Sequence, residues 1–141
     1  MIGQNVAISE RKDTAHPDAT LRVRLGTRDT HYRSQLIPAA TVMRYFADCS
    51  SELGLRQSGR TGLLAAYEGA EFLKPLHVGD FIEIRATVVS RGRRSRRVNL
   101  EAWRYIYAAE WGVPDRRSEI VEPLELVARA TMVSVTPRST A

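Results

Sequence analysis

The sequence contains a single cysteine, Cys49, so no disulfide can form within the chain. Its three histidines, His16, His31 and His77, are scattered without metal-ligand spacing, which argues against a zinc site. No apolar run approaches the ~20 residues that a membrane helix needs, and the first 20 residues mix charges with Pro17 instead of forming the apolar segment of a signal peptide. These absences predict a cytoplasmic protein without metal, disulfide or membrane span.

Lysine is scarce as well, because only Lys12 and Lys74 accompany the arginines that produce the net charge of +5. The densest basic cluster is RGRRSRR, from Arg91 to Arg97. Guanidinium groups bind phosphates in a bidentate manner, so this cluster fits a pantetheine-linked nucleotide, an acidic carrier protein or nucleic acid, and equally an ordinary solvated surface. No aromatic side chains alternate with the arginines as stacking platforms, which disfavours nucleic acid.

A chain of 141 residues is long enough for one core and too short to divide convincingly into two. We expect a loosely ordered lead-in over residues 1–20, one domain over 21–136 and a short tail over 137–141. Residues 21–25 alternate apolar and polar side chains, as a strand with one buried face does. Residues 36–53 are mostly apolar with a narrow polar stripe at helical spacing, which predicts a largely buried helix.

The ends of this helix have their own signals. Pro38 fits a first turn, where no backbone donor is needed, and Gly54 lies where a helix commonly ends. Four segments rich in Val, Ile, Ala and aromatic residues follow, separated by turn signals, and predict long strands over 63–76, 81–91, 96–107 and 124–136. The order predicts an α+β architecture in which an antiparallel sheet wraps around one helix. Its open edges lead us to expect pairing with a second copy.

The segment FLKPLHVGD, from Phe72 to Asp80, resembles the strand-and-turn motif of hotdog-fold thioesterases and dehydratases. That family also places its long central helix directly after the first strand, so the resemblance extends over residues 20–136. It implies a single hotdog domain that acts on acyl thioesters of coenzyme A or of an acyl carrier protein. It also implies a homodimer with composite sites, and no cofactor.

Two further stretches, DTHY at residues 29–32 and AAYEGAEF at 65–72, resemble the branch of the family that contains 3-aminobutyryl-CoA ammonia lyase. That lyase eliminates ammonia from a β-amino acyl-CoA. The chain is also similar to thioesterase-like enzymes that add glycine to α,β-unsaturated thioesters. The resemblance therefore implies conjugate addition of an amine such as glycine or ammonia, or its reverse, with hydrolysis of the thioester as a possible following step.

Conjugate addition needs a base for the amine, a proton for Cα and a stabilised enolate oxygen. Glu68 is the candidate acid or base, because alternation places it on a strand face with small or apolar neighbours, where a carboxylate is costly without a role or a partner. Alternation places Glu71 on the opposite face with Gly69 and Tyr67, so it is the fallback.

The loop before the helix holds the second group of candidates. His31 is suited to proton transfer and Tyr32 to a hydrogen bond with the substrate, while a surface histidine and a packing tyrosine are the plain alternatives. Asp29 either orients His31 or caps the turn. The start of the helix, residues 34–38, offers backbone N–H groups to an enolate oxygen. The predicted substrate contacts are Asp29, Arg33, Ser34, Phe72, Arg93, Arg94 and Arg96.

Other residues are expected to have structural roles. Cys49 lies among apolar helix positions and is expected to be a core thiol, and the alternating Trp103, Tyr105 and Tyr107 are expected mainly to fill the core, with an acyl tunnel as the alternative. Two other functions remain open. A plain thioesterase would use the same carboxylate to activate water, and a non-catalytic acyl-binding domain would use neither Glu68 nor His31.

Overall fold

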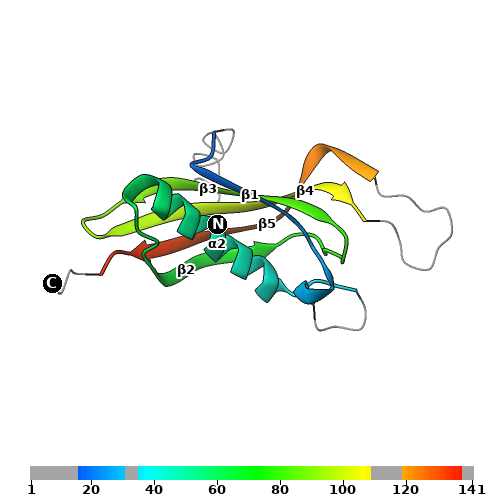
Figure 1. The fold of residues 1–141 in the computed structure, drawn as a ribbon, viewed down its shortest axis with the longest axis horizontal. Coiled ribbons are helices and arrows are strands. Elements are labelled where there is room, and N and C mark those ends of the chain that lie inside the picture. The colour runs from blue at the N-terminus through cyan, green and yellow to red at the C-terminus, as the bar shows by residue number, and fades with distance from the viewer. Residues whose placement is uncertain (1–15, 31–34, 109–118, 138–141) are drawn as a thin grey trace.

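The computed structural model describes residues 16–30, 35–108 and 119–137. In these ranges one antiparallel sheet wraps around the long helix α2 (Ala39–Ser58), with a short 3-10 turn, η1 (Thr27–Asp29), before it (Figure 1). The predicted α+β architecture is therefore confirmed. The strands stand in the order β1-β3-β4-β5-β2 and comprise β1 (Ala19–Arg24), β2 (Leu63–Phe72), β3 (Phe81–Arg91), β4 (Ser95–Tyr107) and β5 (Glu119–Val135).

The core lies between α2 and the concave face of the sheet. Every second residue of β3 and β4 points into it, which is the pleat expected of strands with one buried face. Each large side chain buried there contributes about 1.5–3 kcal/mol. The fully buried members include Phe46, Cys49 and Leu53 of α2, Ile82 and Ile84 of β3, and Val98 and Leu100 of β4. Cys49 is thus a core thiol, as expected, and burial raises its pKa to about 12.

The helix ends differ from the prediction. Pro38 precedes the helix as its N-cap, and Gly54 lies inside it. A Cβ at Gly54 would come within 2.4 Å of the Arg60 carbonyl oxygen, so glycine is needed there for close packing rather than for chain reversal. The helix ends instead at Gly59, whose positive φ of 70° and N–H bond to the Leu55 carbonyl form the C-cap.

The aromatic residues of β4 do not fill the core, contrary to the sequence-based expectation. Leu100 and Ala102 take the positions that face α2, so Trp103 and Tyr105 lie on the other face of the sheet, whereas Tyr107, beyond an irregularity of the strand, lies beside His77. Each of the three rings stacks against an arginine guanidinium, at 4.2–5.3 Å from the ring centre. The pairs are Trp103 with Arg85, Tyr105 with Arg22 and Tyr107 with Arg104.

The strand β2 forms one edge of the sheet. Within the described ranges its backbone pairs with β5 on one side only, and nine of its ten residues are exposed, Tyr67 being the half-buried exception. Several of the exposed side chains on and beside it are large and apolar, namely Leu63, Leu64, Phe72 and Leu73. An exposed apolar edge strand is a template for pairing with another chain.

Candidate functional site

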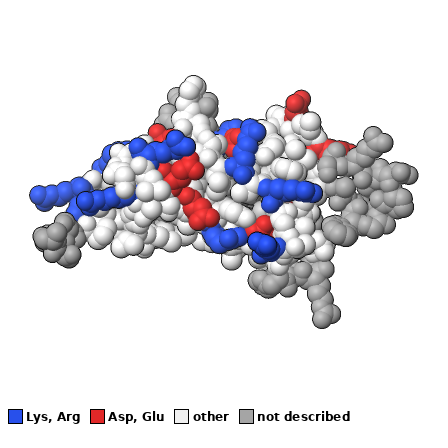
Figure 2. Space-filling model, in the orientation of Figure 1, with Lys and Arg blue, Asp and Glu red and all other residues white. Residues whose placement is uncertain are grey.

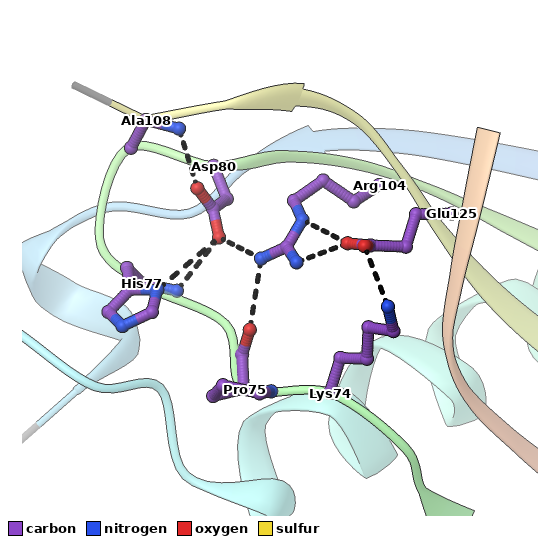
Figure 3. A network of polar contacts seen from close by, with 7 residues as sticks. All are labelled: Lys74, Pro75, His77, Asp80, Arg104, Ala108 and Glu125. Atoms are coloured by element: carbon purple, nitrogen blue, oxygen red, sulfur yellow. Dashed lines mark hydrogen bonds and ion pairs between the residues drawn. The ribbon is translucent and has the colours of Figure 1, made fainter. Parts of the chain in front are cut away.

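The hotdog-like motif at residues 72–80 folds as a turn locked by buried charges (Figure 3). The Asp80 carboxylate is fully buried, and one of its oxygens accepts hydrogen bonds from the His77 N–H and from Arg104 Nη1, both at 2.9 Å. Its other oxygen accepts the Ala108 N–H at 2.7 Å. Asp80 therefore joins the β2–β3 turn to the end of β4.

Arg104 is the centre of this network. Its Nη1 also donates to the Pro75 carbonyl at 2.9 Å, and its Nε donates to Glu125 at 2.8 Å. Lys74 completes the cluster at 3.2 Å from Glu125. Partial burial acts to raise the pKa of Glu125, but the hydrogen bonds from Arg104 and Lys74 outweigh it and hold that pKa below its ordinary value. The Pro and Asp of the motif thus have a structural role.

The same turn positions the start of α2. The Ile37 N–H donates to the Leu76 carbonyl and the Val78 N–H donates to the Gln35 carbonyl, both at 2.9 Å. Among the described residues, no side chain caps the first turn of the helix. Gln35 and Ile37, just before α2, are therefore paired to the motif, and the helix starts with backbone N–H groups that no side chain of the described residues caps.

Asp29 caps the turn and anchors α2. One carboxylate oxygen accepts the Gly26 N–H at 2.7 Å, and the other accepts Arg44 Nη2 at 2.8 Å and the Tyr45 hydroxyl at 2.5 Å. The Thr41 hydroxyl donates to the Asp29 carbonyl at 2.6 Å. Of the two roles left open by the sequence, these contacts match the structural one. A substrate contact by Asp29 stays a prediction, and it would compete with three hydrogen bonds.

His31, Tyr32, Arg33 and Ser34 lie outside the described residues, so their predicted roles stay predictions. The two ends of that segment are joined, because the Thr30 hydroxyl donates to the Leu36 carbonyl at 2.6 Å. The described residues on either side of it therefore lie next to the start of α2, since Asp29 contacts the helix and Ile37 pairs with the motif turn.

The faces predicted for Glu68 and Glu71 are wrong. Simple alternation put Glu71 with Tyr67 and opposite Glu68, but the register of β2 shifts between Tyr67 and Ala70, where Gly69 adopts a φ of 92°. Tyr67 points to the helix and donates its hydroxyl to the Met43 carbonyl at 3.0 Å. Glu68 and Glu71 both reach arginines on the face away from α2, because the bulge adds residues to β2.

Glu68 forms a two-pronged ion pair with Arg97. Arg97 Nε lies 2.5 Å from one carboxylate oxygen and Nη2 lies 2.9 Å from the other. The hydrogen bonds from Arg97 hold the pKa of Glu68 below its ordinary value, with a smaller opposing effect from desolvation. The carboxylate is exposed and ionised near neutral pH, so it is a proton acceptor rather than a donor. Its catalytic role stays a prediction.

The four remaining predicted substrate contacts fall into two groups. Phe72, Arg93 and Arg94 are exposed. Arg96 differs, because only 8% of its surface is accessible and its guanidinium lies against Gly54 of α2, while burial lowers its pKa. Arg96 therefore supports the last turns of the helix and stands apart from the exposed arginine cluster in which the sequence placed it.

Sequence reasoning missed Arg104 and Glu83. Arg104 follows the buried Leu100 and Ala102 at intervals of two, so strand alternation places it on the buried face, where a charge needs a partner. The sequence therefore contained a signal for this residue. Glu83 is buried on the opposite face of the sheet, where Arg22 and Arg85 donate to it at 2.8 and 2.5 Å. Only the strand register, which pairs Arg22 with Glu83, could identify this second cluster.

Two negative findings apply to the described ranges. No helix there is long and apolar enough to cross a membrane. Over the same residues, no group of three or more His, Cys, Asp and Glu side chains is arranged to hold a metal ion.

Comparison with known proteins places this site in context. The family described as the thioesterase superfamily matches residues 39–105. Over 120 residues the chain is 30% identical to 3-aminobutyryl-CoA ammonia lyase of Acetoanaerobium sticklandii, a match that covers 85% of this chain and 94% of that enzyme.

Solved structures give a consistent result. The β-alanyl-CoA:ammonia lyase of Clostridium propionicum superposes with a TM-score of 0.78 at 26% identity, covering 83% of this chain and 82% of that chain. A hexameric thioesterase of Yersinia pestis superposes with a TM-score of 0.69 at 18% identity, covering 89% and 92% of the two chains. At that lower identity the similarity shows the fold alone.

Proposed function

Since the chain belongs to the thioesterase superfamily of hotdog-fold proteins, as a relative of 3-aminobutyryl-CoA ammonia lyase, we propose that it makes or breaks a carbon–nitrogen bond in an acyl thioester. The bond joins an amine, glycine or ammonia, to the β-carbon of the acyl group. The proposed carrier of the acyl group is coenzyme A, and an acyl carrier protein is the alternative carrier. The product of the addition direction is a β-amino acyl thioester.

The observation that carries this proposal is the length of the match to the ammonia lyase. The similarity covers 94% of that enzyme, so it spans the whole domain instead of one motif. The motif at residues 72–80 by itself supports only the fold, because its Asp80 is consumed by structural hydrogen bonds. The similarity to a second ammonia lyase, at a TM-score of 0.78, points to the same reaction class.

Glu68 is the proposed base in the addition direction. Its carboxylate takes a proton from the incoming ammonium group, and the freed nitrogen lone pair attacks Cβ. The π electrons of the C=C bond move onto the thioester carbonyl as an enolate, which then collects a proton at Cα. Arg97 keeps Glu68 free of a proton, as a base must be, but its hydrogen bonds also lower the basicity of the carboxylate, so the proposed transfer requires this exposed pair to open. The N–H groups at the start of α2 suit the enolate oxygen.

We propose that a site combining Glu68 with the N–H groups at the start of α2 needs two copies of the chain. Glu68 reaches toward the face away from α2, so it does not approach the start of its own helix. The free edge of β2 and its exposed Leu63, Leu64 and Phe72 suit pairing with the same strand of a second copy. A twofold axis normal to the sheet makes the paired strands antiparallel.

The oligomer is tested by light scattering at micromolar concentration, where we expect a dimer or a larger assembly of dimers. A lysine in the middle of the free edge, Ala66→Lys, is expected to shift the protein toward monomer, while a lysine on β1 at the other edge, Thr20→Lys, leaves the assembly intact. A wild-type monomer would exclude composite sites.

The reaction is tested by incubating the protein with crotonyl-CoA and longer enoyl-CoA thioesters, with and without glycine or ammonia. Mass spectrometry is expected to show an acyl-CoA heavier by one amine molecule, formed only when the amine is present. Loss of the acyl group to water at equal rates with and without amine would exclude the carbon–nitrogen chemistry.

A plain thioesterase is the second candidate, favoured by the superfamily match over residues 39–105. In that reaction the same carboxylate would activate water for attack on the thioester carbonyl. Release of free coenzyme A from saturated and unsaturated thioesters alike distinguishes this activity from the first.

A further inference from the structure

The ion pair of Glu68 and Arg97 lies at the bulge of β2, on the free edge of the sheet. Next to Glu68, Gly69 has a φ of 92°, and a Cβ added there would meet no atom of the described residues within 4 Å. The side chains of Glu68 and Arg97 are 45% and 44% exposed. The described part of the chain therefore leaves space beside the pair, and a small molecule can reach both charges.

Arg97 holds the Glu68 carboxylate along one edge of its guanidinium group. Nε lies 2.5 Å from one carboxylate oxygen and Nη2 lies 2.9 Å from the other, which is the two-pronged geometry that arginine offers to carboxylates in general. On the remaining side, Nη1 donates to the Ser90 hydroxyl at 3.4 Å. The same edge of Arg97 can therefore hold the carboxylate of a ligand in place of Glu68.

The second arginine–glutamate pair of β2 differs from the first. Arg129 reaches Glu71 through Nε at 2.9 Å, and only 26% of the Arg129 side chain is exposed. Arg129 thus lacks the accessible two-pronged edge that Arg97 presents. It lies on the same face of the sheet, so it is a matched control for Arg97.

The pair of Glu68 and Arg97 can exchange partners easily. An ion pair with both side chains so exposed contributes little to stability, because water screens the charges. A ligand that carries both an ammonium and a carboxylate group replaces one contact by two. Its ammonium group binds Glu68 and its carboxylate binds Arg97, so neither protein charge is left without a partner.

The charge around the pair favours such a ligand over a bare ammonium ion. Arg97 is the third residue of β4 after the β3–β4 hairpin, and Figure 2 shows basic side chains projecting from the end of the molecule that carries this hairpin. An ammonium ion that approaches Glu68 is repelled by the Arg97 guanidinium and by this basic end. A carboxylate on the same molecule removes that repulsion, because it neutralises Arg97.

We infer that Glu68 and Arg97 bind the amine substrate as an α-amino acid zwitterion such as glycine, whose carboxylate takes the place of Glu68 on Arg97. This inference rests on the proposed function for the reaction that follows. Binding of the substrate then opens the ion pair, and the released Glu68 carboxylate faces the ammonium group that it is to deprotonate.

The chemical step consumes no other reactant. The ammonium group gives one proton to Glu68, the nitrogen lone pair forms the bond to Cβ, and the enolate takes one proton at Cα. The sum is the addition of one N–H bond across the C=C bond. The substrate carboxylate stays on Arg97, so the amine is held while the new bond forms.

The first experiment measures binding without turnover. The wild-type protein is titrated with glycine and followed by NMR, alone and with S-butyl-CoA, a thioether that neither hydrolyses nor adds an amine. Glycine is expected to bind ~10-fold more tightly or better than methylamine or acetate, since each of these offers one charged group instead of two. Arg97→Gln is expected to weaken glycine binding ~10–100-fold, whereas Arg129→Gln should bind as wild type does.

Three results of this titration overturn the inference. They are no saturable binding of glycine in either condition, acetate or methylamine binding as tightly as glycine, and equal affinity of wild type and Arg97→Gln for glycine. Because the pair is exposed, Arg97→Gln is expected to fold, and its thermal midpoint checks this.

Kinetics separate recognition of the amine from a structural role of Arg97. In Arg97→Gln, kcat/KM for glycine is expected to fall ~10–100-fold relative to kcat/KM for ammonia, because only glycine loses a contact. Arg97→Lys keeps the charge and loses the two-pronged edge, so its ratio should fall between those of wild type and Arg97→Gln. Damage to the fold lowers both values by the same factor. An unchanged ratio therefore overturns the inference.

The inference and the proposed function can fail separately. If wild type adds ammonia to an enoyl-CoA but does not add glycine, the inference is rejected and the proposed function stands. If wild type adds neither amine but binds glycine in a manner that Arg97→Gln abolishes, the proposed reaction fails and the amino-acid site is retained.

Discussion

Two arginine–carboxylate pairs of this protein have the same chemistry and different surroundings. In the pair of Asp80 and Arg104 the side chains are 0% and 3% exposed, and each group is bonded to backbone or to a further charge as well. In the pair of Glu68 and Arg97 they are 45% and 44% exposed. A buried pair is costly to break because one charge is left without water or partner, whereas an exposed pair can open to solvent.

This difference in burial distinguishes a structural carboxylate, Asp80, from one that is accessible for chemistry, Glu68. The most recognisable motif in the sequence ends at Asp80, and that carboxylate is fully used in holding the β2–β3 turn against β4. Glu68 belongs to a less distinctive stretch, but its carboxylate is accessible, ionised and on the free edge of the sheet. We therefore expect changes at Asp80 to affect folding and changes at Glu68 to affect turnover.

The largest expected effect is on the rate of amine addition. Glu68→Gln keeps the size of the side chain but removes its basic site, so kcat on an enoyl-CoA with amine is expected to fall ~10²–10⁴-fold. Because the pair is exposed, the thermal midpoint should stay at the wild-type value.

Glu71→Gln is the matched control, since Glu71 lies on the same strand, reaches the same face and pairs with Arg129 at 2.9 Å. Turnover by the Glu68 variant near the wild-type rate, or a greater loss at Glu71, would exclude Glu68 as the base.

The next effect is on stability. Asp80→Ala removes one partner of a buried pair. It leaves Arg104 with Glu125 as its remaining carboxylate and the His77 and Ala108 N–H groups without their acceptor, so the free energy of unfolding in urea is expected to fall by about 3–5 kcal/mol. If the variant does not accumulate, Asp80→Asn provides a milder change whose midpoint can be measured. Glu71→Ala, at an exposed pair, should cost less than about 1 kcal/mol. Equal losses at the two positions would contradict the distinction drawn from burial.

Asp29 lies between these extremes, because it is buried while its partner Arg44 is exposed. Burial, together with the hydrogen bond to Asp29, raises the pKa of Tyr45 to about 12 from an ordinary value of 10.0. The folded protein thus holds this proton more tightly than the unfolded chain, so the stabilisation is complete below pH 10 and is lost as the pH rises toward 12.

Urea titrations between pH 9 and 12 should therefore show a shallower decline in stability for Tyr45→Phe than for wild type. Part of the decline remains in that variant, because the pKa values of Tyr67 and Cys49 are also raised by burial. Identical slopes for the two proteins would show that Tyr45 ionises freely in the folded state.

The fold was largely accessible from the sequence because its periodic signals are local. Alternation in β1, β3 and β4 and the apolar surface of α2 depend only on which residues neighbour one another along the chain, and these elements appear where they were predicted, within a few residues. The ends of α2 were misplaced because Gly54 is required by a contact with Arg60 and Arg96, which no local pattern contains.

By itself the sequence determined the α+β domain, the buried thiol of Cys49 and the chemical types available at the site. Only the tertiary structure decided which charges are free to react. The bulge at Gly69 brought Glu68 and Glu71 to one face, packing under α2 took Arg96 out of the exposed cluster, and closure of the β2–β3 turn consumed Asp80. The physical reason is that burial and pairing of a charge depend on residues distant in the chain, whereas the periodicity that forms strands and helices is local.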